Sequence, residues 1–155
     1  MKLLFVCSGN TCRSPIAEAI ARQQAAERAL DIEAASAGVS AWDGAPASDG
    51  ALLVGMEHRV DLGEHRSRQL TKEIVADSDL ILAMGPQHHE RIDALGGRGK
   101  SFLLTDYASR GAAPRAISDP YGGDLDTYRA TYEELVSAIR AVLDRVEAER
   151  PRRAS

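Results

Sequence analysis

The stretch that decides the fold lies at the start of the chain and reads KLLFVCSGNTCRSPIAEAIA over residues 2–21. Its apolar beginning, residues 2–7, predicts a short buried strand, and the Ser-Gly-Asn sequence at residues 8–10 is typical of a turn. A helix should follow, with Ser14 as its N-cap and Pro15 in its first helical position. The segment therefore predicts a strand, a loop and a helix N-terminus in direct succession.

The remainder of the chain alternates apolar runs with helical segments. Because strands alternate with helices, the sequence predicts an α/β fold, a single-domain four-stranded parallel sheet with helices on both faces. Residues 105–123 are rich in Gly, Pro, Ser and Asp and lack periodicity, so we expect a long functional loop there. The domain should span residues 1–149 and be followed by a flexible tail at residues 150–155. The further strands are expected at residues 32–37, 80–84 and 102–104, and the helices at residues 14–30, 48–60, 71–76, 86–95 and from 124 or 126 onward.

Composition limits what this chain can be. Its 155 residues are 44% hydrophobic and 27% charged, which suits one compact domain. The net charge of −4 argues against a nucleic-acid scaffold, and no apolar run is long enough for a membrane span or a signal peptide. We therefore expect a cytoplasmic protein. Two cysteines are too few for a disulfide scaffold, or for a zinc site without histidines.

The loop after the first strand has the residue types needed to bind and attack a phosphate. It holds a cysteine, five further residues, then an arginine and a serine, and the cysteine lies where parallel sheets bind ligands. Backbone N–H groups at a helix start can cradle an anion, Gly9 would let the loop bend, and the Arg13 fork can bind phosphoryl oxygens. We expect these positive surroundings to lower the pKa of the Cys7 thiol. We also expect Ser14 to donate a hydrogen bond to the thiolate.

Simpler interpretations of the loop exist. A buried cysteine can end a strand before a capped helix with no chemistry at all, and cysteine is a common core residue. A metal site formed by Cys7, Cys12 and a distant histidine is the weakest interpretation. ATP binding is not expected, because the loop lacks the Gly-Lys-Ser/Thr sequence of nucleotide-binding P-loops. The combined strand, cysteine-to-arginine spacing and helix start favour a phosphate-binding loop after the first strand.

The chain resembles the low-molecular-weight protein phosphatases. The resemblance is carried by Val6-Cys7-Ser8-Gly9-Asn10-Thr11-Cys12-Arg13-Ser14-Pro15-Ile16-Ala17-Glu18, and it continues through Ser36-Ala37-Gly38, His65, Arg68-Gln69 and Asp119-Pro120-Tyr121. It implies a four-stranded parallel sheet and hydrolysis through a phosphocysteine intermediate, with no metal and no cofactor. The partners implied are phosphorylated proteins, and we expect a monomer.

The resemblance also implies a role for each matching residue. Cys7 is the nucleophile, Arg13 binds the phosphoryl group, and Asp119 is the general acid and then the general base. From the residues alone, Asp119-Pro120 is more simply a turn. The implied substrate-binding residues are Ser8, Gly9, Asn10, Thr11, Cys12, Ser14, Trp42 and Tyr121.

Three further residues resemble supporting positions of the family. Asn10 would orient the cradle, with Ser36 and His65 as its supports. Without the resemblance, Asn10 is an ordinary turn residue, Ser36 a hydroxyl at a strand end and His65 a solvated loop histidine. Cys12 resembles a second cysteine that can form a reversible disulfide with the nucleophile, or it simply packs the loop. His88 and His89 are expected on an exposed helix without a role.

Two features bear on the substrate and point in opposite directions. Thr11 and the sequence from Asp119 onward resemble the bacterial protein-arginine phosphatases, whereas Trp42 falls where tyrosine phosphatases place an aromatic wall. We slightly favour phosphoarginine over phosphotyrosine. Three other functions compete with hydrolysis: an arsenate reductase, which would need cysteines after Cys12, a redox thiol protein, and a non-catalytic phosphate-binding module.

Overall fold

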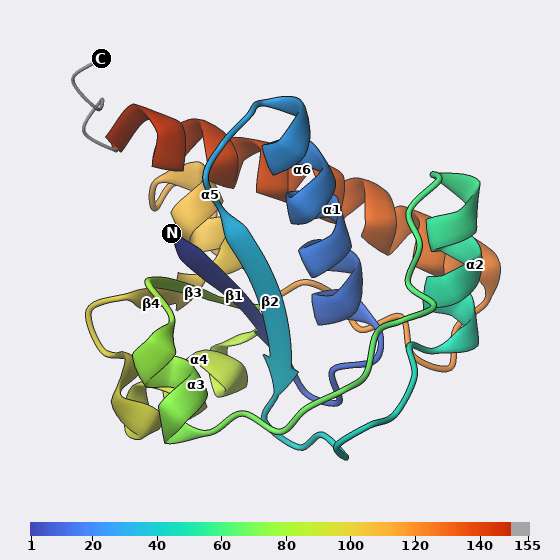
Figure 1. Ribbon diagram of the computed structural model, residues 1–155, viewed down its shortest axis with the longest axis horizontal. Helices are drawn as coiled ribbons and strands as arrows, with labels where there is room; N and C mark the ends of the chain where they lie inside the picture. The colour runs from blue at the N-terminus through green and yellow to red at the C-terminus, as the bar shows by residue number, and fades with distance from the viewer. Residues whose placement is uncertain (150–155) are drawn as a thin grey trace.

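A four-stranded parallel sheet forms the centre of the molecule (Figure 1), in a computed structural model that describes residues 1–149. The strand order is β2-β1-β3-β4, and every neighbouring pair is parallel. The predicted α/β architecture is confirmed, whereas the predicted tail at residues 150–155 lies outside the described residues. The strands are β1 (Lys2–Cys7), β2 (Glu33–Gly38), β3 (Leu80–Ala83) and β4 (Ser101–Leu103).

Helices cover both faces of the sheet, and alternate residues of β1 point to them. Leu3 and Phe5 pack into a core with α1 (Arg13–Glu27), α5 (Leu104–Ser109) and α6 (Leu125–Glu149). Leu4 and Val6 pack on the opposite side, against α3 (Lys72–Asp77), α4 (Pro86–Ile92) and the π-helical turn η1 (Asp93–Gly97). The remaining helix is α2 (Asp49–Glu57).

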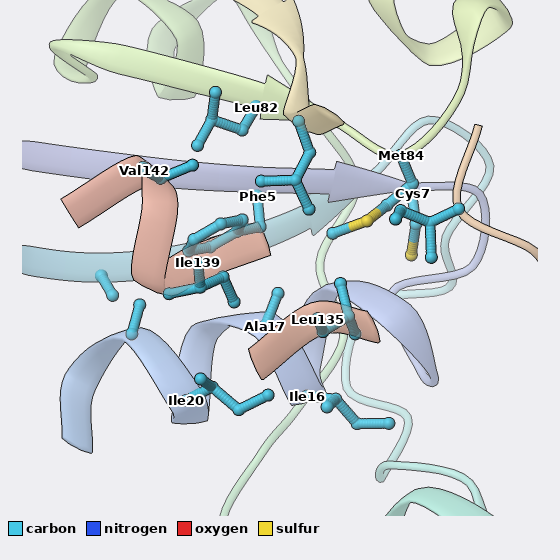
Figure 2. Close-up of a cluster of buried hydrophobic side chains, with 14 of the residues drawn as sticks. Phe5, Cys7, Ile16, Ala17, Ile20, Leu82, Met84, Leu135, Ile139 and Val142 are labelled. Atoms are coloured by element: carbon cyan, nitrogen blue, oxygen red, sulfur yellow. The ribbon is translucent and has the colours of Figure 1, made fainter. Parts of the chain in front are cut away.

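The larger core ends at the nucleophile candidate. Figure 2 shows Cys7 at the carboxyl end of β1, beside the side chains of Met84 and Leu135 and beyond Phe5. All of these side chains are buried. Dense packing under Cys7 restricts the thiol to one position at the edge of the core, where the loop to α1 begins.

The helix boundaries differ from the predictions where side chains have other partners. Helix α1 begins at Arg13, so its N-cap position is Cys12 and the prediction of Ser14 as N-cap is wrong. The Ser14 hydroxyl instead contacts Cys7 and Asn10. The first helix ends at Glu27, before the left-handed Ala29 (φ 53°), and not at residue 30.

The segment predicted as one long loop contains helix α5 and is anchored to the sheet. Thr105, inside α5, hydrogen-bonds through its hydroxyl to the backbone of Arg115. Farther along, the Ile117 N–H donates to the carbonyl of Met84, just after β3, at 2.8 Å. These anchors hold the rest of the segment, including Asp119, at the carboxyl ends of the strands. Within residues 1–149, no helix is both long and apolar enough to cross a membrane.

Candidate active site

The loop between β1 and α1 lines a pocket of about 330 Å³ at the carboxyl end of the sheet. Cys7 is buried at its base, with its Sγ atom 2.9 Å from the Ser14 hydroxyl. The pocket brings together most of the residues singled out from the sequence. It is lined by Cys7, Ser8, Gly9, Thr11, Cys12, Arg13, Ser40, Trp42, Ala45, Asp119 and Tyr121.

Asn10 holds the loop in its bent shape from below. It is fully buried and has a left-handed backbone (φ 57°), a conformation that asparagine adopts more readily than most residues with a side chain. Its side-chain amide donates to the hydroxyls of Ser14 at 2.8 Å and Ser36 at 2.9 Å. Its side-chain oxygen accepts the Arg68 N–H at 2.9 Å. Three groups are thereby tied to the Asn10 side chain, which stabilises the left-handed conformation of this residue.

Ser36 and His65 both contact Asn10, as the resemblance implied. The Ser36 hydroxyl receives the Asn10 amide and in turn donates to Glu18 at 2.9 Å. His65 places its Nε2 atom 2.7 Å from the Asn10 carbonyl oxygen, which makes Nε2 the donor. Sequence reasoning did not assign Glu18 and Arg68 to this network, because their contacts reach it from α1 and from the loop after α2.

Arg13 is aimed into the pocket by backbone and carboxylate partners. Its side chain is buried, one Nη atom donates to the Ile117 carbonyl at 2.9 Å, and the other lies 3.6 Å from an Asp119 oxygen. The Nε–H group is buried and has no hydrogen-bond partner among the described residues. A buried donor without a partner is unfavourable, so this group is ready to bind an anion in the pocket.

Asp119 faces the pocket from the opposite rim. Its side chain is 50% exposed, and one oxygen accepts the Tyr121 N–H at 3.0 Å, which is the geometry of an Asx turn. The other oxygen is the one near Arg13. The residue is therefore both a turn former, as the residues alone suggested, and a carboxylate that reaches the same pocket as Cys7.

Burial raises the pKa of the Cys7 thiol above its ordinary value. The Ser14 hydroxyl, the Arg13 charge and the backbone N–H groups of Ser14 and Asn10 act in the lowering direction, but burial outweighs them. The prediction of a lowered pKa is therefore wrong. That prediction rested on the positive surroundings of the thiol and did not include the deep burial of Cys7 at the end of β1.

We expect Ser14→Ala to raise the pKa of Cys7 further, because it removes a hydrogen bond that favours the thiolate. Alkylation of Cys7 by iodoacetamide should become several-fold slower at pH 7, and its pH profile should move to higher pH. Ser40→Ala is the matched control, since Ser40 also lines the pocket. An unchanged alkylation profile in Ser14→Ala would contradict the assigned hydrogen bond.

A different glycine from the predicted one is needed for the shape of the loop. A Cβ atom on Gly9 would meet only the Thr11 hydroxyl at an ordinary 3.7 Å, so the bend expected there is made by Asn10 instead. At Gly38, the end of β2, a Cβ atom would lie 2.4 Å from the Ser8 carbonyl oxygen. Gly38 therefore lets β2 pass close behind the loop, for which the Ser-Ala-Gly sequence was the only signal.

Two exposed aromatic side chains flank the mouth of the pocket. Trp42 is 85% exposed and Tyr121 is 74% exposed, and both line the pocket together with Thr11. Large aromatic groups with little packing can stack on a planar substrate group, either a phenyl ring or a guanidinium. Thr11 and Trp42, which point to different substrates, therefore line the same pocket.

Cys12 is connected to the wall behind the pocket. Its thiol lies 3.2 Å from the Ser48 hydroxyl and 3.4 Å from the Tyr128 hydroxyl, and both cysteines are free. Burial, followed by the contact with Cys12, raises the pKa of Tyr128 to about 12, so this phenol stays protonated at neutral pH. The same Ser48 hydroxyl caps α2, which links the second cysteine to two helices.

The prediction for His88 is wrong. It was expected on an exposed helix, but the side chain is fully buried, and its Nε2 atom lies 2.8 Å from the Ser8 hydroxyl. His89 is partly exposed and contacts the Ser101 carbonyl at 3.1 Å. In this helix of seven residues, the sequence gives no indication of which of the two neighbouring histidines is buried.

Comparisons with known proteins point to one family of protein phosphatases. The family model described as low molecular weight phosphotyrosine protein phosphatase matches residues 2–152. The chain is 36% identical to a protein-arginine-phosphatase of Bacillus subtilis (strain 168), over 97% of this chain and 99% of the relative. It is 39% identical to the low molecular weight protein-tyrosine-phosphatase PtpB of Staphylococcus haemolyticus (strain JCSC1435), over 90% and 95%. A solved YwlE arginine phosphatase, a cysteine-to-serine mutant with a phosphorylated active-site serine, is similar with a TM-score of 0.91 at 36% identity, covering 97% and 98%.

Proposed function

Since this chain belongs to the low molecular weight phosphotyrosine protein phosphatase family and is a cysteine-dependent protein phosphatase, we propose that Cys7, Arg13 and Asp119 carry its reaction. One observation carries the assignment: a buried thiol, a buried guanidinium and a half-exposed carboxylate line the same pocket. The phosphorylated active-site serine in the YwlE mutant supports attack on phosphorus from this position.

In the first step the Cys7 thiolate, formed by loss of its proton to solvent, attacks phosphorus. A sulfur–phosphorus bond forms, and the bond from phosphorus to the leaving oxygen or nitrogen breaks. Asp119, in its acid form, gives its proton to the leaving group. Arg13 and the backbone N–H groups of the loop bind the phosphoryl oxygens, which keeps the group in line with the sulfur.

In the second step water replaces the sulfur. The Asp119 carboxylate takes a proton from the water, whose oxygen attacks phosphorus, and the sulfur–phosphorus bond breaks. Inorganic phosphate and the Cys7 thiolate are the products. The Ser14 hydroxyl, 2.9 Å from the sulfur, stabilises the departing thiolate by a hydrogen bond. The chain's own residues thus account for both proton transfers.

The substrates that we propose are phosphorylated protein side chains, with phosphoarginine slightly favoured over phosphotyrosine. Thr11 lines the pocket and supports phosphoarginine, as does the protein-arginine-phosphatase that the chain resembles over 97% of its length. Trp42 at the same mouth, and the PtpB tyrosine phosphatase among the relatives, support phosphotyrosine. Because one pocket can accept both, the difference in transition-state binding should be small.

The deciding experiment compares kcat/KM for one peptide carrying either phosphoarginine or phosphotyrosine, with reductant and with EDTA. We expect the phosphoarginine peptide to be the better substrate. A preference for phosphotyrosine would overturn the substrate proposal and leave the reaction mechanism in place. Absence of turnover on both peptides would contradict the mechanism itself.

Thr11→Ile should move the preference toward phosphotyrosine. The substitution replaces a hydroxyl at the pocket wall by a larger apolar group, which removes a hydrogen-bonding partner for a guanidinium and adds contact area for a phenyl ring. We expect the ratio of the two kcat/KM values to change by about tenfold or more. Thr11→Ser, which keeps the hydroxyl, is the control. An unchanged ratio in Thr11→Ile would remove Thr11 from the specificity argument.

We also propose that the enzyme works as a monomer in the cytoplasm. Two free thiols in one loop suit a reducing compartment. Only four large apolar side chains stand out as exposed in the described chain, and two of them, Trp42 and Tyr121, belong to the mouth of the pocket. Sedimentation velocity at micromolar concentration would test the oligomeric state.

A further inference from the structure

His88 is a buried titratable residue beside the cradle that the reaction above does not use. It lies in α4, directly after β3, and none of its surface is exposed. Its Nε2 atom is 2.8 Å from the Ser8 hydroxyl, whereas its Nδ1 atom is buried with no hydrogen-bond partner among residues 1–149. The contact joins a buried imidazole nitrogen to a hydroxyl of the loop that lines the pocket.

The imidazole is neutral at physiological pH. Burial lowers the pKa of His88 to about 4, and the nearby charge of Arg13 acts in the same direction, while Asp119 opposes it. A neutral imidazole carries one N–H group, and the other nitrogen is an acceptor. Which nitrogen holds the proton decides what the Ser8 hydroxyl can do.

The surroundings favour the proton on Nε2. With the proton on Nδ1, the imidazole would bury an N–H donor without an acceptor, and would do so near the cationic Arg13. With the proton on Nε2, that N–H group donates to the Ser8 hydroxyl, and only a lone pair on Nδ1 stays unpaired. Buried donors without partners are the rarer case in folded proteins.

We propose that His88 is a positioning residue that donates its Nε2–H to the Ser8 hydroxyl and thereby turns the Ser8 proton toward the phosphoryl oxygens bound in the pocket. Ser8 lines that pocket, and an oxygen that accepts from His88 keeps its own proton free to donate. The Ser8 hydroxyl thus adds one oriented donor to those of the loop and Arg13. The inference rests on the proposed reaction at Cys7.

The first test is a double-mutant cycle on kcat/KM with Ser8→Ala and His88→Leu. Each single variant should lose about tenfold, the effect of one well-placed hydrogen bond. In the Ser8→Ala background, His88→Leu should cost little more, because the partner of the imidazole is already gone. An equal loss from His88→Leu with and without Ser8 would overturn the proposal.

Two further variants separate positioning from packing. His88→Gln places an amide N–H close to the former Nε2 position and should restore most of the activity, whereas His88→Asn is too short and should resemble His88→Leu. His89→Gln, the neighbouring change on the same helix, should leave kcat/KM unchanged. If His88→Leu fails to fold, the Gln and Asn pair still decides the question, and equal activity of that pair would overturn the proposal.

A spectroscopic measurement tests the assigned tautomer without relying on activity. In ¹⁵N-labelled wild-type protein at pH 7, the His88 nitrogens should show a protonated Nε2 and an unprotonated Nδ1. The opposite tautomer would overturn the proposal even if the reaction at Cys7 is correct. Conversely, a wild-type protein that shows the expected tautomer but hydrolyses no phosphorylated peptide would refute the reaction and not the hydrogen bond.

Discussion

Cys7→Ser should abolish turnover while leaving the cradle able to bind phosphate. The serine hydroxyl is far harder to ionise than a thiol, so the attack on phosphorus becomes slow. It is also a much poorer leaving group, so hydrolysis of the phosphorylated intermediate becomes slow as well. We expect kcat to fall on the order of 10⁴-fold or more. Binding of inorganic phosphate, measured by calorimetry, should persist because Arg13 and the loop backbone are unchanged.

Cys12→Ser is the matched control for this change. It removes the other thiol of the same loop, whose contacts run to Ser48 and Tyr128 and away from the Cys7–Ser14 pair. We expect Cys12→Ser to keep turnover within about tenfold of wild type, since a hydroxyl can take over contacts of this kind. Turnover by Cys7→Ser within tenfold of wild type would refute the covalent mechanism.

The sheet and the cradle were predictable because their signals are local in the sequence. An apolar run ending in Cys7, turn residues and a helix start all lie within residues 2–21, and parallel pairing follows from the alternation of strands and helices. The element boundaries were less predictable. Ser14 has the chemistry of an N-cap, but its hydroxyl is used by Cys7 and Asn10, and that competition depends on the folded loop.

The rest of the site depends on contacts between distant segments. His88 meets Ser8 across eighty positions of sequence, and nothing in the residues around His88 distinguishes it from His89. Asn10 meets Ser36 and His65 in the same way, and only the family resemblance pointed to that network. The direction of the Cys7 pKa shift was missed because burial depends on the packed core under β1.

Asp119→Asn should separate the two proton transfers of the reaction. The amide can neither donate the proton to the leaving group nor accept one from water, and loss of a general acid or base costs about 10²- to 10⁴-fold in rate. The loss should be greatest for phosphopeptides, whose leaving groups need the proton. It should be smaller for p-nitrophenyl phosphate, whose leaving group departs readily without one. Asp126→Asn, the same change on an exposed carboxylate paired with Arg129, is the control.

Pre-steady-state kinetics of Asp119→Asn with p-nitrophenyl phosphate give the sharper result. The first step depends less on the acid for this substrate, while hydrolysis of the phosphocysteine still lacks its base, so the intermediate should accumulate. We therefore expect a burst of about one p-nitrophenol per active site, followed by a slow steady state. A uniform loss for all leaving groups with no burst would mean that Asp119 acts only through its contact with Arg13, 3.6 Å away, and takes no part in proton transfer. Unchanged turnover would instead mean that neither proton transfer depends on Asp119, and it would refute the assignment of Asp119 as general acid and base.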